Sequence, residues 1–203
     1  NSYKKSKTKS ILDIGSGTGD FLKICKDNNW TISGVEPSEK ARQIAKTKDI
    51  HLSEKIEKIN KQFDIITMWH VLEHIPNLED QINKIKKLLK PNGILIIAVP
   101  NYKSYDAKFY KEYWAAFDVP RHIWHFSKIS ISKIFNEINM KIEKIIPMKF
   151  DSYYVSLLSE KNKNKNFNPI KAFTIGLLSN LSANRTKEYS SHIYILKSSK
   201  KPF

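Results

Sequence analysis

The strongest chemical signal in the chain is a cluster of glycines in the stretch ILDIGSGTGDF, residues 11–21. Three of the six glycines, Gly15, Gly17 and Gly19, occupy alternate positions there. Glycine tolerates positive φ angles and lets a ligand approach the backbone where a Cβ would collide. An apolar strand over residues 11–14 that passes through this turn into a helix over residues 20–28 leaves backbone N–H groups free at the start of the helix. The stretch therefore predicts a turn that binds a ligand.

Acidic residues near this turn indicate which ligand it binds. Asp13 stands just before the glycines, and Asp20 occupies the position where a dinucleotide fingerprint, G-x-G-x-x-G, requires glycine. Glu36, followed by Pro37, ends a short apolar stretch over residues 31–35. An acid at the tip of the second strand of a βαβ unit is placed to accept both hydroxyls of a ribose. We therefore predict a nucleoside cofactor with a cationic amino-acid part and not a pyrophosphate.

A second functional segment follows the sequence FDIITMW, residues 63–69. This almost continuous apolar run is typical of a strand that is covered on both faces of a parallel sheet. It leads directly into WHVLEH, residues 69–74. Because the carboxyl ends of parallel strands line the ligand crevice of an open α/β sheet, we expect Trp69 and His70 to border the cofactor.

The segment over residues 101–128 is rich in aromatic side chains and ends close to the sequence DVPRHIWHFS. It follows a strand tip and has no regular period, so we interpret it as a lid over the substrate pocket, with Tyr113, Trp114 and Arg121 facing the substrate. The alternative is an aromatic mini-core that covers the edge of the sheet. Arg121 either clamps a carboxylate or phosphate of the acceptor or pairs with Asp118.

The elements that position these residues alternate between strand and helix, which predicts a parallel sheet. Apolar stripes and start signals such as Pro37 and Ser38 predict helices, and short apolar runs predict strands. Further helices are expected over residues 39–47, 53–60, 78–89, 130–139 and 170–181, and further strands over 50–52, 94–99, 140–150 and 190–197, with a short apolar piece over 153–158. Residues 1–10 read as a polar lead-in and residues 161–168 as a polar linker.

Composition bounds the class of protein. The 203 residues are 40% hydrophobic, enough for one domain with a sizeable core, and the single cysteine excludes an internal disulfide and indicates a reducing, cytoplasmic compartment. No apolar run approaches the roughly 18 residues of a membrane span. The net charge is +15, but only three basic residues are arginine and the lysines are scattered, so we interpret the charge as solvated surface and consider nucleic acid an unlikely partner. The chain begins at Asn1 and not at a methionine, so we expect it to be a fragment of a longer protein.

Taken together, these motifs resemble the class I S-adenosylmethionine-dependent methyltransferases. The resemblance rests on Asp13 with the three glycines, on Glu36, and on the sequences WHVLEHIPN, LLKPNG, YW and DVPRHIWHFS. They look like a small-molecule subgroup related to the ubiquinone-pathway O-methyltransferases. The resemblance implies a Rossmann-like, doubly wound, mostly parallel seven-stranded sheet whose last strand is antiparallel. It also implies a single domain with a cofactor-binding half over residues 9–100, a lid over 101–128 and a C-terminal half over 129–203 that carries a small helical cap.

The resemblance also implies roles for the motif residues. Asp13, Gly15, Gly17 and Gly19 would hold the methionine part of S-adenosylmethionine, Glu36 with Pro37 the ribose, and Trp69 with His70 would border the cofactor. The acceptor would be a small molecule, such as a sugar, a polyketide-like compound or a quinone-type metabolite, bound by a monomer or homodimer. A hydroxyl acceptor must lose its proton, and since histidine titrates near neutrality we favour His122 or His125 as the base, with His74 third.

Several alternatives stay open at this point. Glu-His pairs recur at the site of Glu73 and His74 in the ubiquinone-pathway relatives, which raises the hypothesis of a divalent metal held with His70. Positions i, i+3 and i+4 also share one helical face, so we predict no metal. The basic charge favours a nucleic-acid or protein methyltransferase as a second function. A non-catalytic cofactor-binding module of a larger assembly is the third.

Overall fold

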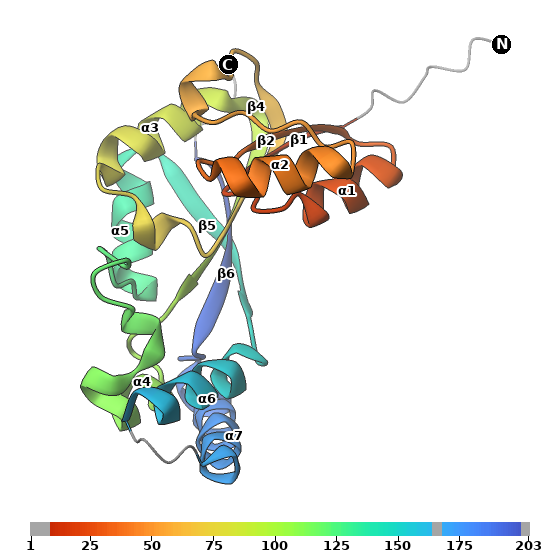
Figure 1. Cartoon of the computed structure of the whole chain (residues 1–203). Coiled ribbons are helices and arrows are strands. Elements are labelled where there is room, and N and C mark those ends of the chain that lie inside the picture. The colour runs from red at the N-terminus through yellow and green to blue at the C-terminus, as the bar shows by residue number, and fades with distance from the viewer. Residues whose placement is uncertain (1–8, 164–167, 200–203) are drawn as a thin grey trace, which may run out of the picture.

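The computed structural model describes residues 9–163 and 168–199 (Figure 1). Part of the predicted lead-in, residues 1–8, and part of the predicted linker, residues 164–167, lie outside the described residues. A six-stranded sheet runs through the molecule in the order β2-β1-β3-β4-β6-β5. The strands are β1 (Ser10–Ile14), β2 (Thr31–Val35), β3 (Phe63–Trp69), β4 (Leu89–Pro100), β5 (Met140–Pro147) and β6 (Ser191–Ser198).

Strand direction matches the predicted class. β2, β1, β3 and β4 pair in parallel, whereas β6 is antiparallel to both β4 and β5. The α/β fold and the antiparallel last strand are therefore confirmed. β4 begins at Leu89 and thus includes the KPNG sequence that was expected to separate a helix from a shorter strand.

The predicted count of seven strands is wrong for the part of the chain that the structure describes. The expected strand over residues 50–52 is replaced by one isolated parallel bridge between Val35 and Ser53. Two backbone hydrogen bonds, from Ser53 to Gly34 and from Glu36 to Ser53, tie this segment to β2. The expected helix over 53–60 is reduced to the 3-10 turn η1 (Ile56–Lys58). The apolar run is too short to extend the pairing, because the chain turns away after Ser53.

Helices cover both faces of the sheet, so that neighbouring residues of one strand enter different cores. α1 (Asp20–Asp27) and α2 (Glu39–Thr47) cover one face, and α3 (Leu78–Leu88) and α5 (Lys128–Glu137) lie against the other (Figure 1). Ile11 belongs to the cluster with Leu22 and Ala45, whereas Leu12 belongs to the large cluster with Ile82 and Phe135. This alternation follows from the period of two in a strand and gives the doubly wound architecture.

A third body of helices stands at one end of the sheet. It comprises α4 (Tyr105–Tyr110), α6 (Asp151–Lys163) and α7 (Pro169–Thr186), with the 3-10 turns η3 (Lys111–Tyr113) and η4 (Ala115–Phe117) (Figure 1). The predicted piece over 153–158 is part of α6, and β5 ends at Pro147 instead of residue 150. No helix among the described residues combines the length and hydropathy that a membrane crossing requires.

The buried carboxylate of Asp106 joins the parts of this body. It accepts hydrogen bonds from Trp114 Nε1 at 2.8 Å, from Ser179 Oγ at 2.6 Å and from Ser190 Oγ at 2.7 Å. Trp114 and Tyr110 are fully buried in a cluster with residues of α6 and α7. Much of the aromatic segment therefore forms a mini-core with α6 and α7, and both its cover of the sheet edge and its action as a lid stay predictions.

Candidate active site

The glycine turn between β1 and α1 has the predicted conformation. Gly15, Gly17 and Gly19 have φ angles of 74°, 51° and 78°. A Cβ on Gly15 would lie 2.3 Å from Val71 Cγ2, and one on Gly19 would lie 3.1 Å from side-chain atoms of α2 and the following loop. A Cβ on Gly17 would meet nothing within 4 Å. The outer two glycines are therefore required by packing, and the middle one faces open space where a ligand can approach the backbone.

Glu36 closes over this turn from the tip of β2. Its Oε2 accepts the Gly17 amide at 2.8 Å, and its Oε1 accepts the Ser38 amide at 2.9 Å. Ser38 is also the N-cap of α2, since its side chain accepts the Ala41 amide. The carboxylate is half-buried and keeps further lone pairs for hydroxyl donors. Local sequence thus fixes the orientation of the acid that was predicted to hold a ribose, whereas Pro37 beside it is exposed.

Asp13 lies beneath the turn and is almost completely buried. Burial raises the pKa of its carboxyl to about 6, although hydrogen bonds from Thr67 and Ser16 act in the opposite direction. The Thr67 hydroxyl of β3 donates to Asp13 Oδ1 at 2.6 Å. Asp13 therefore ties β1 to β3 below the glycines, and its predicted contact with a cofactor stays a prediction.

At the tip of β3, Trp69 packs edge-on against Phe21 of α1 with ring centroids 5.6 Å apart. His70 follows with a φ angle of 54°, a left-handed conformation that is uncommon for a residue with a Cβ. Its ring lies between two acids, with Nδ1 3.4 Å from Glu73 Oε1 and Nε2 3.4 Å from Asp151 Oδ2. Burial lowers the pKa of His70, but its hydrogen bonds and charge interactions with Asp151 and Glu73 prevail and raise it to about 9. His70 is therefore a cation at neutral pH.

The raised pKa of His70 predicts a pH-dependent stability. A histidine whose pKa rises from 6.5 to about 9 on folding contributes stability that is complete below pH 6.5 and is lost as the pH rises through 9. Because its side chain is 37% exposed, we expect about 1 kcal/mol after solvent screening. Urea unfolding across this pH window should show that His70→Gln removes this part of the pH dependence. His51→Gln, at an exposed histidine, should leave it intact; equal profiles for the native chain and His70→Gln would contradict the assignment.

A cavity of about 580 Å³ opens beside His70. The strand tips contribute His70 and Pro100, and the predicted lid contributes five residues between positions 115 and 122. Helix α6 and the segments next to β5 and β6 supply the remaining wall, which is largely apolar. The lining residues are His70, Pro100, Ala115, Ala116, Asp118, Arg121, His122, Met148, Asp151, Tyr154, Val155, Leu158, Asn162 and Ser191.

The predicted base and substrate residues divide between this cavity and its surroundings. His122 and Arg121 line the cavity, and Arg121 Nη2 pairs with Asp118 Oδ2 at 2.8 Å. His125 is not among the lining residues; its Nε2 is hydrogen-bonded to the Phe117 carbonyl at 3.0 Å. Tyr113 is not among them either.

Trp114, predicted to face the substrate, lies instead in the cluster that it forms with Tyr110 and residues of α6 and α7, and only 1% of its surface is exposed. The indole N–H donates to Asp106, and its ring packs edge-on against Phe117. Burial against α6 and α7 encloses the whole side chain in this structure, and contact with a substrate stays a prediction.

Backbone contacts bring two distant segments together beside the cavity. The Glu73 carbonyl accepts the amides of Ile123 and Trp124 at 2.9 and 3.2 Å. The Trp124 indole donates to the Ile75 carbonyl at 2.7 Å. These bonds lay the end of the predicted lid along the 3-10 turn η2 (Leu72–His74), and so place His122 next to Glu73 and His74.

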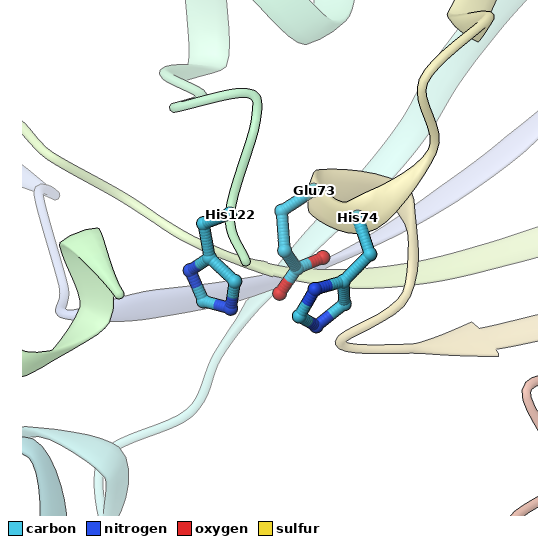
Figure 2. A group of neighbouring side chains, drawn as sticks. All are labelled: Glu73, His74 and His122. Atoms are coloured by element: carbon cyan, nitrogen blue, oxygen red, sulfur yellow. The ribbon is translucent and has the colours of Figure 1, made fainter. Parts of the chain in front are cut away.

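Glu73, His74 and His122 form a compact cluster (Figure 2). One ligand-type atom from each lies within 4.8 Å of the others. Nδ1 of His74 is 3.0 Å from the Arg121 carbonyl and Nδ1 of His122 is 2.8 Å from the Ala116 carbonyl. A carbonyl only accepts, so each Nδ1 carries a proton, and in the neutral imidazole each Nε2 has a lone pair. Glu73 is 1% exposed; its Oε1 lies 3.4 Å from Nδ1 of His70, and its Oε2 has no hydrogen-bond partner among the described residues. The cluster can therefore bind a divalent cation, a possibility that the sequence assigned to His70 and not to His122.

Sequence patterns gave no sign of two cavity residues on α6. Asp151 and Tyr154 lie in a stretch with no motif, and their position depends on how α6 packs against the sheet. The sequence predicts no helix at residue 151, so no local signal marks Asp151, which the structure places at the start of α6.

Comparisons with known proteins agree with this geometry. A family model described as "Methyltransferase domain" matches residues 2–145. The ubiquinone biosynthesis O-methyltransferase of Azoarcus sp. (strain BH72) is 28% identical over 113 residues, which are 48% of this chain and 47% of that protein. The Coxiella burnetii enzyme of the same name is 31% identical over 114 residues, 49% and 47% of the two chains. The matched region therefore spans about half the length of these relatives.

Solved structures show the same fold at low identity. A SAM-dependent methyltransferase from Thermotoga maritima has a TM-score of 0.64 at 16% identity, covering 97% of this chain and 84% of that one. The magnesium protoporphyrin IX methyltransferase of Synechocystis PCC 6803 with bound SAH has a TM-score of 0.63 at 15% identity, covering 94% and 74%. With the family model matching most of the chain, the protein belongs to the class I S-adenosylmethionine-dependent methyltransferases and is related to the ubiquinone-pathway O-methyltransferases.

Proposed function

We propose that this protein transfers the methyl group of S-adenosylmethionine, the cofactor of its family, to a hydroxyl of a small-molecule acceptor. The observation that carries the proposal is the adjacency of the glycine turn and the cavity at one edge of the sheet. Gly15 packs against Val71, and the neighbouring residue His70 lines the cavity. A cofactor on the turn and an acceptor in the cavity would thus meet at the tip of β3.

The residues around the turn fit this cofactor. The open space above Gly17 admits a ligand against the backbone, and the Glu36 carboxylate, oriented by two amides, offers acceptors for the two ribose hydroxyls. The acid beneath the turn, Asp13, adds negative potential on the side where the cationic amino-acid part would bind. When bound, the sulfonium supplies an electrophilic methyl group.

The chain itself must align the acceptor and take up its proton. His122 is the favoured base, because its Nε2 keeps a lone pair and its ring lines the cavity. Asp118 Oδ2, 3.8 Å from that nitrogen, would stabilise the imidazolium that forms. His70 is already protonated at neutral pH, so it is suited to orient an acceptor oxygen or to hold α6 through Asp151.

The cavity bounds the class of acceptor. A volume of about 580 Å³ suits a molecule of one to a few rings, and the apolar wall from Ala116, Val155 and Leu158 suits a ring face. We favour a hydroxylated aromatic or quinone-type acceptor, as the names of the relatives suggest, over a sugar or a polyketide-like compound.

Calorimetric titration with S-adenosylhomocysteine, with NAD as control, tests the cofactor assignment. We expect micromolar binding of the former and none of the latter, because the turn has Asp20 where a pyrophosphate fingerprint requires glycine. Binding of NAD alone would show that the glycine turn binds a dinucleotide and not S-adenosylmethionine. Binding of S-adenosylhomocysteine without turnover on any hydroxylated acceptor would favour a non-catalytic module.

The cluster of Glu73, His74 and His122 gives His122 a second candidate role as a metal ligand. Two imidazole nitrogens and a carboxylate suit Zn²⁺ or Mn²⁺, which would act as a Lewis acid at an acceptor oxygen. We expect the chain to bind one Zn²⁺ in a calorimetric titration, and Glu73→Gln to weaken that binding at least about tenfold. Glu79→Gln, in the exposed first turn of α3, is the matched control.

Chelation separates the two roles of His122. Loss of turnover after exhaustive chelation, restored by added metal, would assign His122 to the metal. Full turnover after chelation, together with a pH–rate profile that loses its acidic limb in His122→Asn, would assign it as the base and discard a metal requirement.

A further inference from the structure

The helical hairpin of α6 and α7 presents its large apolar side chains to solvent. Ile170, Phe173, Leu177 and Leu181 of α7 are between 40% and 79% exposed. Their spacing of three or four residues places them on one side of the helix, here named the α7 face. Only scattered exposed apolar residues are normal for a surface, so a continuous stripe of this kind requires an explanation.

The opposite side of α7 explains how the stripe arises. The helix buries mainly small residues, Ala172, Gly176, Ser179 and Ala183, against its neighbours. A Cβ on Gly176 would lie 2.9 Å from Tyr153 Cα, so the two helices approach closely there. Phe173 stacks on Tyr153 with ring centroids 5.1 Å apart at the border of the face. The usual pattern is thus inverted, because small residues form the packed side and large apolar residues form the outer side.

The charge around the α7 face is one-sided. α7 contains no acidic residue, and the described part of the hairpin and its C-cap carry five basic ones, Lys161, Lys163, Lys171, Arg185 and Lys187. The two acids of the hairpin are engaged inside the molecule. Asp151 pairs with His70, and the fully buried Glu160 lies 3.0 Å from Lys171 Nζ, so this second pair offsets one of the five positive charges. An anionic partner therefore meets no exposed carboxylate on this hairpin.

We propose that the α7 face binds an anionic lipid surface, with the apolar stripe inserted among the headgroups. Apolar side chains flanked by basic residues on a helix without acids form an interfacial helix, which lies in the plane of a bilayer and does not cross it. A second copy of the chain is a poorer partner, because each copy carries a net charge of +15 and the two basic hairpins would repel. In Figure 1 the hairpin stands at the end of the molecule away from α1 and α2, so docking leaves the cofactor turn accessible.

The docked orientation also bears on the cavity. Tyr154 of α6 is 64% exposed and lines the cavity, as do Val155 and Leu158 on the same helix. The wall formed by α6 therefore lies next to the surface that would contact lipid. This arrangement brings one wall of the cavity close to the membrane.

Vesicle co-sedimentation of the whole chain tests the proposal without any methylation assay. We expect binding to phosphatidylcholine vesicles that contain about one-third phosphatidylglycerol, weak binding to pure phosphatidylcholine, and weakening by high salt. The triple variant Phe173→Ser, Leu177→Ser, Leu181→Ser should lower the partition coefficient about a hundredfold. A second triple variant, Ile24→Ser, Ile44→Ser, Ile129→Ser, removes equally exposed side chains elsewhere and should bind as the native chain does.

The possible outcomes separate clearly. Binding that depends on anionic lipid and on the α7 face supports the proposal. Failure of the native chain to bind anionic vesicles overturns it, as does an equal effect of the two triple variants. Sedimentation that shows a dimer of the native chain and a monomer of the α7-face variant, without vesicle binding, would assign the face to a second copy instead. If the α7-face variant loses its thermal unfolding transition, the lipid and salt comparisons on the native chain decide alone.

Discussion

Replacing Glu36 with alanine should lower the affinity for S-adenosylhomocysteine by about a hundredfold or more. The carboxylate would accept both ribose hydroxyls, and two charge-assisted hydrogen bonds together contribute about 3 kcal/mol, which corresponds to that factor. The variant also frees the amides of Gly17 and Ser38, which the two oxygens now accept, so the turn loses its orientation. Calorimetric titration measures the change.

Two controls separate recognition from folding. Glu39→Ala removes an exposed acid on α2 and should leave the affinity unchanged. Glu36→Gln keeps the shape of the side chain but loses its charge and one acceptor. Its affinity for S-adenosylhomocysteine should therefore lie between those of Glu36→Ala and the native chain. An affinity of Glu36→Ala within threefold of the native value would show that the ribose is held elsewhere.

Substituting Gly15 with alanine should destabilise the fold strongly, by about 3 kcal/mol. Two causes act together, the φ angle of 74° and a Cβ that would lie 2.3 Å from Val71 Cγ2. Val71→Ala in the same chain should recover part of the loss, because it removes the clash and leaves the backbone strain. Urea unfolding measures both variants, and a loss below about 1 kcal/mol for Gly15→Ala would mean that the turn relaxes easily.

Gly17→Ala is the matched comparison within the same turn. The φ angle of 51° costs about 1 kcal/mol, but the new methyl group meets no atom within 4 Å. Its main effect should therefore appear in cofactor binding, where we expect at least a tenfold loss. The pair of variants thus separates a glycine needed for packing from a glycine needed for ligand approach.

The sequence predicted well wherever one local signal determines the structure. The bounds of β2, α2 and β3 follow from an apolar run, a serine cap and a buried strand, and the structure has the same bounds. The glycine turn and Glu36 could be predicted for the same reason, since a turn between a strand and a helix leaves little choice of arrangement.

The sequence predicted poorly wherever a side chain depends on distant segments. His122 joins Glu73 and His74 only because backbone bonds lay residues 121–124 along η2. Trp114 was predicted to face the substrate because its segment has no regular period, but Asp106 and the helices around it bury the indole. The prediction of a strand over residues 50–52 was wrong because pairing to an edge strand needs more than a short apolar run. The polar residues after Ser53 do not extend the pairing.

The place of β6 in the sheet has a consequence for how the protein is made. β6 lies between β4 and β5, so β5 has no strand partner among the described residues that precede Ser191. During synthesis, β5 and both hairpin helices emerge from the ribosome before the strand that joins β5 to the sheet. The cofactor-binding strands can pair early, whereas one edge of β4 stays open until the final strand arrives. Nascent chains that stall in the hairpin would therefore expose that edge and should be the ones that require chaperones.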